Sequence, residues 1–269
     1  MTTKWHTLLL LVLLSLYFIS CSKSDNTTNP VILSDFEKDS ILGLTFGDSI
    51  KAIHLTNSFG NITINGWNFH DSMRVYMQKK ISAADEETAE RYFTGFSCGT
   101  KLQADTLALI IVSPENNAEV TFDHLDISVN IPSELICKVF ESAGFTFADQ
   151  LSNDLTVLSS KKSVQVQRHI GSCRITSEED INVQSYLLVD GTCNLASLHG
   201  DISLAIPDHT SSLVSAYAAS GEIKYSGLVF NSVTISGQTM TGVLGSGDGM
   251  IDLRTDDGDI LLRGYASRK

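Results

Sequence analysis

The sequence repeats a short glycine–acid–isoleucine motif, and this repeat limits the possible folds more than any other feature. Gly200-Asp201-Ile202 recurs 21 residues later as Gly221-Glu222-Ile223, and again as Gly258-Asp259-Ile260. Glycine permits the backbone conformation of a tight corner, an acid tolerates the adjoining position, and the next apolar residue can turn inward. The motif therefore predicts a series of corners, each followed by a strand.

Longer segments repeat at similar intervals. The aligned pairs are Asp126–Pro132 with Asp201–Pro207, Gly171–Ile175 with Gly191–Leu195, and Glu179–Val183 with Gly200–Leu204. The last two pairs are offset by 20 and 21 residues, which indicates coils of about 20 residues built from two units of about 9 to 10, the length of a strand with its corner. Stacked coils of this kind form a β-solenoid, so we expect an all-β, parallel solenoid.

The predicted strands have one apolar face. Within Ile202–Pro207, residues two apart share a face, so the isoleucines and the leucine are expected to point inward while Ser203 and Ala205 point outward. Pro132 and Pro207 are expected to end strands, because proline cannot donate a ladder hydrogen bond. An antiparallel β-sandwich with coincidental repeats is the alternative.

The N-terminus has the pattern of a secretory signal peptide over residues 1–20. One cation, Lys4, precedes an apolar run from Leu8 to Ile19, which ends at the small residue Ser20. The run is shorter than the about 20 apolar residues that a membrane-spanning helix needs. An uncleaved anchor is the alternative.

Phe18-Ile19-Ser20-Cys21 resembles a bacterial lipobox, in which the cysteine is diacylated and becomes the mature N-terminus. Ser20 and Cys21 match the motif, whereas Phe18 and Ile19 stand where Leu and a smaller residue are usual. We therefore expect lipid attachment at Cys21, with ordinary signal cleavage as the alternative, and a tether over residues 21–40. Acyl chains would bind the protein to a membrane.

The rest of the chain is predicted as two regions. Residues 41–115 are expected to form strands and one short helix, and residues 116–269 the solenoid repeats. Ser82 is a natural N-cap for a helix running to Arg91, and the acids that follow Ser82 suit the positive end of the helix dipole. The strands expected in the first region are Ile62–Ile64, Met73–Met77 and Leu107–Val112.

The charge balance excludes one class of partner. The chain has 19 Lys and Arg against 31 Asp and Glu, a net charge of −12. Nucleic-acid binding needs clusters of Lys and Arg to neutralise phosphates, so we expect no nucleic-acid partner.

The chain resembles the family of putative auto-transporter adhesins, also called the head GIN domain. The resemblance rests on the strand Ile62-Thr-Ile-Asn-Gly-Trp67, the helix around Glu86–Glu90, and the glycine repeats from Gly200 to Leu262, and it covers roughly residues 45–264. It implies a right-handed β-solenoid on a secreted or lipid-anchored protein of the bacterial envelope. The family brings no catalytic residues. The glycine repeats are weak between residues 123 and 160, where this sequence departs from the pattern.

The residues do not assemble a recognisable catalytic, cofactor or metal motif, so none is predicted. The six histidines after the signal segment are scattered, without HExxH spacing: His54, His70, His124, His169, His199 and His209. One acidic stretch faintly resembles a calcium-binding repeat, but it occurs in a single imperfect copy: Asp248, Asp252, Asp256, Asp257 and Asp259. A solvated row of corner acids is the simpler interpretation.

Four cysteines follow Cys21, and two of them occupy equivalent repeat positions. Cys173 and Cys193 are offset by 20 residues, so stacked coils would place them about 4.8 Å apart. A disulfide and a pair of buried free thiols both remain open.

These observations predict a non-enzymatic, lipid-anchored protein of the bacterial cell envelope, on the outer membrane and either periplasmic or surface-exposed. It would bind an unidentified protein, glycan or surface through an adhesin-like solenoid. An envelope-stress sensing module is the alternative from another class. A carbohydrate-active enzyme is a third, because solenoid enzymes use paired carboxylates.

Overall fold

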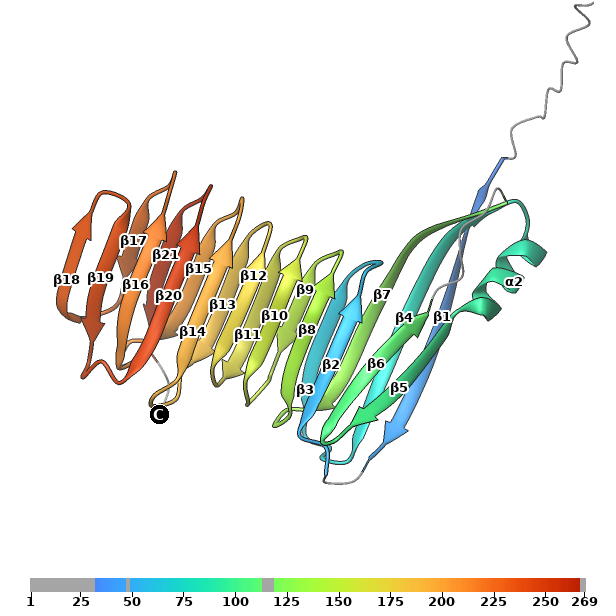
Figure 1. The fold of residues 1–269 in the computed structure, drawn as a ribbon, viewed down its shortest axis with the longest axis horizontal. Coiled ribbons are helices and arrows are strands. Elements are labelled where there is room, and N and C mark those ends of the chain that lie inside the picture. The colour runs from blue at the N-terminus through green and yellow to red at the C-terminus, as the bar shows by residue number, and fades with distance from the viewer. Residues whose placement is uncertain (1–31, 47–48, 113–118, 267–269) are drawn as a thin grey trace, which may run out of the picture. The chain divides into compact units, whose positions relative to one another are not determined.

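The computed structural model describes residues 32–46, 49–112 and 119–266, and Figure 1 shows their arrangement. Residues from Leu33 onward group into one compact unit built almost entirely of strands. Within these ranges, no helix has the length and apolar character needed to cross a membrane.

The strands form two sheets, here named sheet A and sheet B. In spatial order, sheet A contains β1 (Ser34–Thr45), β4 (Ser72–Ala83), β7 (Val120–Pro132), β3 (Ile62–Trp67), β9 (Thr146–Asp149), β11 (Val164–Ile170), β13 (Ile181–Tyr186), β15 (Ile202–Pro207), β21 (Ile260–Tyr265) and β17 (Ile223–Ser226). Sheet B contains β18 (Phe230–Ser236), β19 (Thr239–Leu244), β16 (Ser212–Ala218), β20 (Gly249–Thr255), β14 (Thr192–Ser197), β12 (Cys173–Ser177), β10 (Leu155–Ser160), β8 (Ile136–Ser142), β2 (Ala52–Asn57), β6 (Thr106–Val112) and β5 (Ser97–Gln103).

Each coil runs along sheet B and returns along sheet A. Strands of successive coils pair in parallel, as β10 with β12 and β11 with β13. The parallel all-β solenoid predicted from the repeats is confirmed, and the parallel ladders exclude the antiparallel sandwich. The regular ladder also includes β8, β9 and β10, in the stretch where the glycine repeats are weak.

The core lies between the two sheets and follows the predicted alternation. Ile202, Leu204 and Ile206 are fully buried, whereas Ser203 and Ala205 are only partly covered. Strands β7 and β15 end at their prolines, as predicted. One continuous apolar cluster extends through the coils because equivalent inward positions stack on one another.

The order of the coils at the C-terminal end differs from the order in the sequence. The last coil, β20 with β21, lies between the β14–β15 coil and the β16–β17 coil. Ile260 is therefore in register with both Ile202 and Ile223, so the motif at Gly221 does not follow directly on that at Gly200. The antiparallel hairpin β18–β19 pairs with β16 beyond this coil.

The N-terminal end is also interleaved. The β2–β3 coil lies between β6 and β7 on one side and β8 and β9 on the other. The predicted boundary between two regions, at residues 115 and 116, thus falls between β6 and β7. Both strands belong to the same stack of coils, because β6 pairs with β2 and β7 pairs with β3. Strands β1, β4 and β7 continue sheet A in antiparallel order.

The one helix of the described ranges, α2 (Glu86–Gly95), packs against β4, β1 and β7. It covers a second apolar cluster that includes Ile81, Tyr92 and Phe93. The helix begins later than predicted. Its N-cap is Asp85, whose Oδ1 accepts a hydrogen bond of 2.7 Å from the Thr88 amide.

Two predicted boundaries therefore shift. Ser82 belongs to β4, where its hydroxyl donates to the Asp35 carboxylate at 2.9 Å instead of capping the helix. The predicted tether, residues 21–40, overlaps β1, which starts at Ser34 and pairs with β4 along its whole length. The polar residues of β1 belong to an edge strand, which composition alone does not distinguish from a linker.

Candidate functional site

Cys21, the predicted site of lipid attachment, lies outside the described residues, as do the signal segment and most of the tether. The remaining candidate residues fall on the corners, the core and the outer face of the coils.

The corner acids form a ladder along one edge of the stack, where sheet B strands pass into sheet A strands. Asp180 Oδ1 accepts a hydrogen bond from the Asp201 amide at 2.9 Å, and Asp201 Oδ1 accepts one from the Asp259 amide at 2.8 Å. Asp259 Oδ1 in turn accepts from the Glu222 amide at 2.8 Å. We call this set the acid–amide ladder. Asp259 was interpreted above as part of a solvated row of acids; its exposed carboxylate also binds the next corner.

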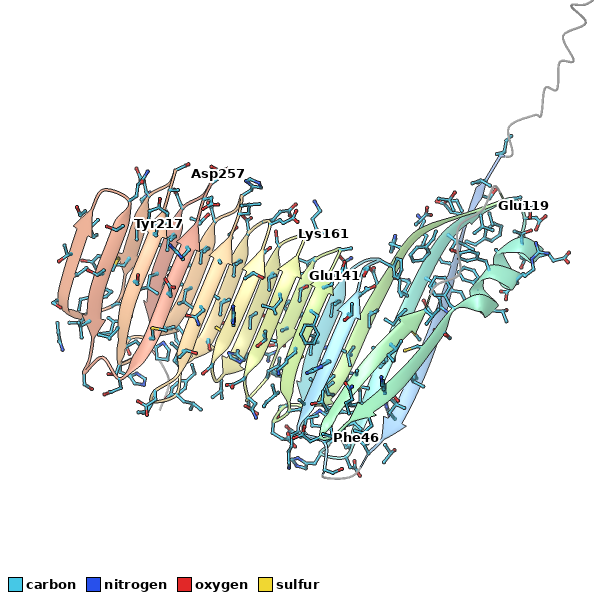
Figure 2. The ribbon with its side chains drawn as sticks, viewed as in Figure 1. Phe46, Glu119, Glu141, Lys161, Tyr217 and Asp257 are labelled. Carbon is cyan, nitrogen blue, oxygen red and sulfur yellow. The ribbon has the colours of Figure 1, made fainter. Side chains whose placement is uncertain are left out.

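The glycines that precede Asp201, Glu222 and Asp259 are required by close approach of the backbone. A Cβ on Gly258 would lie 2.3 Å from the Gly200 carbonyl oxygen, and one on Gly221 would lie 1.9 Å from the Gly258 carbonyl oxygen. The glycine–acid motif thus combines two needs: a corner without a side chain and a carboxylate that reaches the next amide. Figure 2 shows Glu141, Lys161 and Asp257 along this same edge.

The acidic stretch that resembles a calcium repeat does not converge on one point. Asp248 accepts hydrogen bonds from Ser246 and Ser211 at 2.6 and 2.8 Å, and these bonds hold its pKa below the ordinary value. Asp257 binds His199 at 3.0 Å and Ser220 at 3.2 Å, which lowers the pKa of Asp257. Across the described ranges, no three His, Cys, Asp or Glu side chains are grouped so that they could hold a metal ion.

The histidines are dispersed over different coils. His169 is the buried one: its Nε2 lies 2.9 Å from the Asn153 carbonyl and its Nδ1 lies 2.8 Å from the Ser185 hydroxyl. Burial lowers the pKa of His169, which favours the neutral ring. The partners of the others differ: His54 with Phe140, His70 with Glu134, His124 with Asp126, His199 with Asp257, and His209 with Asp208.

A ladder of buried hydroxyls, not predicted from the sequence, runs along sheet B. Ser142, Ser160, Ser177, Ser197 and Thr255 are in register at the ends of successive sheet B strands. Each donates to a carbonyl of the corner that follows or adjoins it, as Ser197 does to Glu179 at 2.8 Å. The sequence signal for this ladder is a serine four residues after each of the two equivalent cysteines, Ser177 after Cys173 and Ser197 after Cys193.

The two cysteines lie in register, as predicted. Cys173 and Cys193 are buried free thiols on β12 and β14, with their Sγ atoms 3.1 Å apart. The hydrogen bond from Cys173, together with burial, raises the pKa of Cys193. Burial also raises the pKa of Cys137, on β8, to about 12. Cys137 and Cys193 are therefore protonated at neutral pH and pack as small apolar groups.

A groove of about 490 Å³ crosses the outer face of sheet A over β1, β4, β7 and β3. Tyr76 and Phe145 supply aromatic surface, and Ile41, which is 68% exposed, supplies aliphatic surface. Polar groups converge on the same space from Asp39, Asn61, Gln78 and Asp126. A concave surface that combines aromatic faces with a few polar groups is the usual form of a binding site, and we name it the sheet A groove.

Several proteins with solved structures align with most of this chain at low sequence identity. A "putative cell adhesion protein" from Clostridium sporogenes is 13% identical, with a TM-score of 0.48, over 86% of this chain and 100% of its own. A "putative adhesin" from Bacteroides fragilis is 13% identical, with a TM-score of 0.39, over 85% of this chain and 97% of its own. A "putative lipid binding protein" from Parabacteroides distasonis is 13% identical, with a TM-score of 0.27, over 86% and 95%.

A comparison with curated protein sequences gave no match. The sequence profile described as Toastrack DUF4097 matches residues 47–263, a range that starts just before β2 and ends within β21. The match thus includes every coil of the stack, its interleaved ends and both ladders. The chain belongs to the Toastrack DUF4097 family.

Proposed function

We propose that this protein is a non-enzymatic, lipid-anchored component of the bacterial cell envelope, similar to the head GIN domain proteins, that binds a protein or glycan through its solenoid. The observation that carries the binding role is the sheet A groove, where Tyr76 and Phe145 adjoin carboxylate and amide groups. Aromatic faces stack on apolar ring surfaces, while the amides and carboxylates bind hydroxyls or backbone groups.

The corner carboxylates support a role without catalysis. A general acid or base must be able to exchange a proton with a substrate. Asp180, Asp201 and Asp259 instead accept hydrogen bonds from backbone amides of adjoining coils. These hydrogen bonds join each corner to the next and give the three carboxylates a structural role.

The groove is tested by binding the purified protein to arrays of immobilised glycans and extracellular-matrix proteins. The variant Tyr76→Ala should weaken binding at least about tenfold, which corresponds to about 1.4 kcal/mol. Tyr217→Ala is the matched control, because Tyr217 also lies on an outer face, on β16 of sheet B, where it packs under Arg254. Equal losses in both variants, or no loss in either, would count against the sheet A groove as the binding site.

The anchor is tested separately by feeding cells labelled palmitate. The wild-type chain should carry the label, and Cys21→Ala should lose it and leave the membrane fraction. A neighbouring substitution, Ser24→Ala, should retain both label and location. Label that persists in Cys21→Ala would contradict lipid attachment at this residue.

A further inference from the structure

The two ends of the coil stack are finished differently. At the N-terminal end, α2 covers the extended part of β1, β4 and β7 and encloses its own apolar cluster. At the C-terminal end, sheet A stops at β17, while sheet B continues past the last coil as the hairpin β18–β19. The described residues place no strand of sheet A opposite this hairpin. Solenoids normally need a cap at each terminus.

The face of the hairpin that continues the core is apolar and exposed. Ile235 of β18 is opposite Met240 of β19, which is opposite Ala216 of β16. Met240 and Ala216 are 1% and 3% exposed, whereas Ile235 is 51% exposed. Val233 occupies the same inward row and is 38% exposed, although Val214, two strands away, is buried.

Strand β18 has the alternation of a strand that is buried on one face. Its outward row consists of Ser232, Thr234 and Ser236, which pair with the outward row of β19. Val233 and Ile235 alternate with these polar residues. A strand exposed on both faces gains nothing from such a pattern, so the inward row is suited to a covering layer.

Sheet A also ends at a strand with one unpaired edge. Strand β17 pairs with β21 on one side only, and its inward Tyr225 is 38% exposed although its register partner, Leu262, is 1% exposed. The ring of Tyr225 meets that of Phe230 edge-on, with centroids 5.0 Å apart. The open end thus combines a free strand edge with a row of uncovered inward side chains.

The open end lacks charge, although the whole chain carries −12. Residues 225–247 contain no Asp, Glu, Lys, Arg or His. Natural edge strands usually carry charges or prolines that prevent pairing with other chains, and β18 has neither. On the adjoining β17, Lys224 is already paired with Glu222 at 2.6 Å. Two copies of this acidic protein could therefore approach each other at this end without local repulsion.

We propose that the open end is an interface with a second copy of this chain. At this end, sheet B extends beyond sheet A by the two strands of the hairpin, β18 and β19. Two copies related by a two-fold rotation about the strand direction would fit together, because the longer sheet B of each copy would lie in line with the shorter sheet A of the other. Each hairpin then supplies the missing layer opposite the other hairpin, and each β18 adds to the free edge of the other copy's β17. A closed, isologous dimer results.

The strand directions are consistent with this pairing. Strand β19 is antiparallel to β16 and β18 is antiparallel to β19, so β18 runs in the direction of β16. The coils return along sheet A, so β17 runs opposite to β16. A rotation about the strand direction preserves these directions, and the second copy's β18 would therefore pair with β17 as an antiparallel strand. Val233 and Ile235 of both copies would enter a shared core.

Sedimentation velocity of the purified full chain in a mild detergent, across a range of concentrations, tests this interface. Wild type should show a dimer in equilibrium with monomer. Ile235→Lys should weaken the association at least about 30-fold, the effect of removing a strong interface residue. Thr234→Lys places the same charge on the outward face of the same strand and should leave the association unchanged.

Val233→Lys and its outward control Ser232→Lys provide a second pair of variants. Thermal unfolding should show each variant folded, because the inward residues are exposed in the single chain. A wild-type monomer at every concentration would overturn the proposal, whatever other protein binds this end. Equal association in Ile235→Lys and Thr234→Lys would also overturn it, since the apolar N-terminal run of the full chain would then account for the association. The proposal does not depend on the envelope location or on the sheet A groove.

Discussion

The Asp201 carboxylate accepts a hydrogen bond of 2.8 Å from the backbone amide of Asp259, a residue 58 positions further along the chain. This bond joins the corner of one coil to the corner of the last coil of the sequence. The next bond of the acid–amide ladder then runs from the Glu222 amide to Asp259. One type of contact therefore both spaces the corners and holds the inserted last coil in place.

Asp201→Ala removes the acceptor for the Asp259 amide. Because this corner is exposed, water can replace part of the bond, and we expect a loss of about 0.5–1.5 kcal/mol in the free energy of unfolding. Asp201→Asn keeps an oxygen at the same position and should lose less. Urea unfolding followed by circular dichroism measures both. Equal losses would show that the charge, and not the hydrogen bond, contributes the stability.

Gly258→Ala should destabilise the protein through a direct clash. The added Cβ would lie 2.3 Å from the Gly200 carbonyl, within the backbone of the adjoining corner. We expect a loss of about 1–3 kcal/mol, as in overpacked cores, measured as a lower urea midpoint. Gly99→Ala is the matched control, since a Cβ there meets no atom within 4 Å. A neutral Gly258→Ala would mean that the corners can move apart at little cost.

Ser197→Ala should be costly because Ser197 lies at the buried end of β14. Its hydroxyl donates to the Glu179 carbonyl at 2.8 Å and accepts from the Gly200 amide at 2.9 Å. Leaving these buried groups without a partner costs about 1–3 kcal/mol. Ser215→Ala, on the exposed face of β16, should change the free energy of unfolding by less than about 0.5 kcal/mol. A comparable effect in the two variants would refute a structural role for the hydroxyl ladder.

The stability of the fold should depend on pH through His169. Burial lowers its folded pKa below the ordinary value of 6.5, and the nearby Asp154 carboxylate opposes that shift only in part. A lowered folded pKa means that the unfolded chain binds the proton more readily. The contribution is therefore complete above about pH 6.5 and is lost as the pH falls from there through the folded pKa.

His169→Gln should reduce this dependence between pH 7 and pH 5. Gln184→Ala, at an exposed position of β13 without a titratable side chain, serves as the control and should leave the slope in this range close to that of the wild type. Unfolding free energies at several pH values give both slopes. Burial also lowers the pKa of His54, so part of the wild-type slope should remain in His169→Gln. An unaltered slope in His169→Gln would contradict the role given to this histidine.

The repeat predicted the coils but not their order, for a physical reason. The same type of corner, a glycine followed by an acid, precedes Ile202, Ile223 and Ile260. Corners of this type can stack on one another with similar hydrogen bonds. Sequence spacing therefore identifies equivalent positions without identifying neighbours. The chain leaves the space of one coil open when it passes from the β14–β15 coil to the β16–β17 coil. After the hairpin β18–β19 it returns and fills that space with β20 and β21.

The boundaries of individual helices and strands were also only partly predictable from the sequence. Ser82 and Asp85 are both good N-caps, and only the pairing of β4 with β1 and β7 places Ser82 in a strand. Strand β1 has polar residues on both of its faces, so its sequence shows no regular alternation of apolar and polar residues. The sheet A groove could not be predicted, because Tyr76 and Phe145 lie far apart in the sequence and meet only through the sheet order.

The lipid-anchored solenoid proposed here can lie in the periplasm or on the cell surface, and an adhesin-like binding role requires the surface. We propose display outside the cell from a lipid at Cys21, which trypsin treatment of intact cells tests most directly. Cleavage after Lys23 would separate the lipid from the folded coils. The account predicts that a fragment beginning at Ser24 is released into the medium, while a periplasmic marker protein stays intact. A chain that stays full-length and cell-bound until the outer membrane is broken would contradict display on the surface.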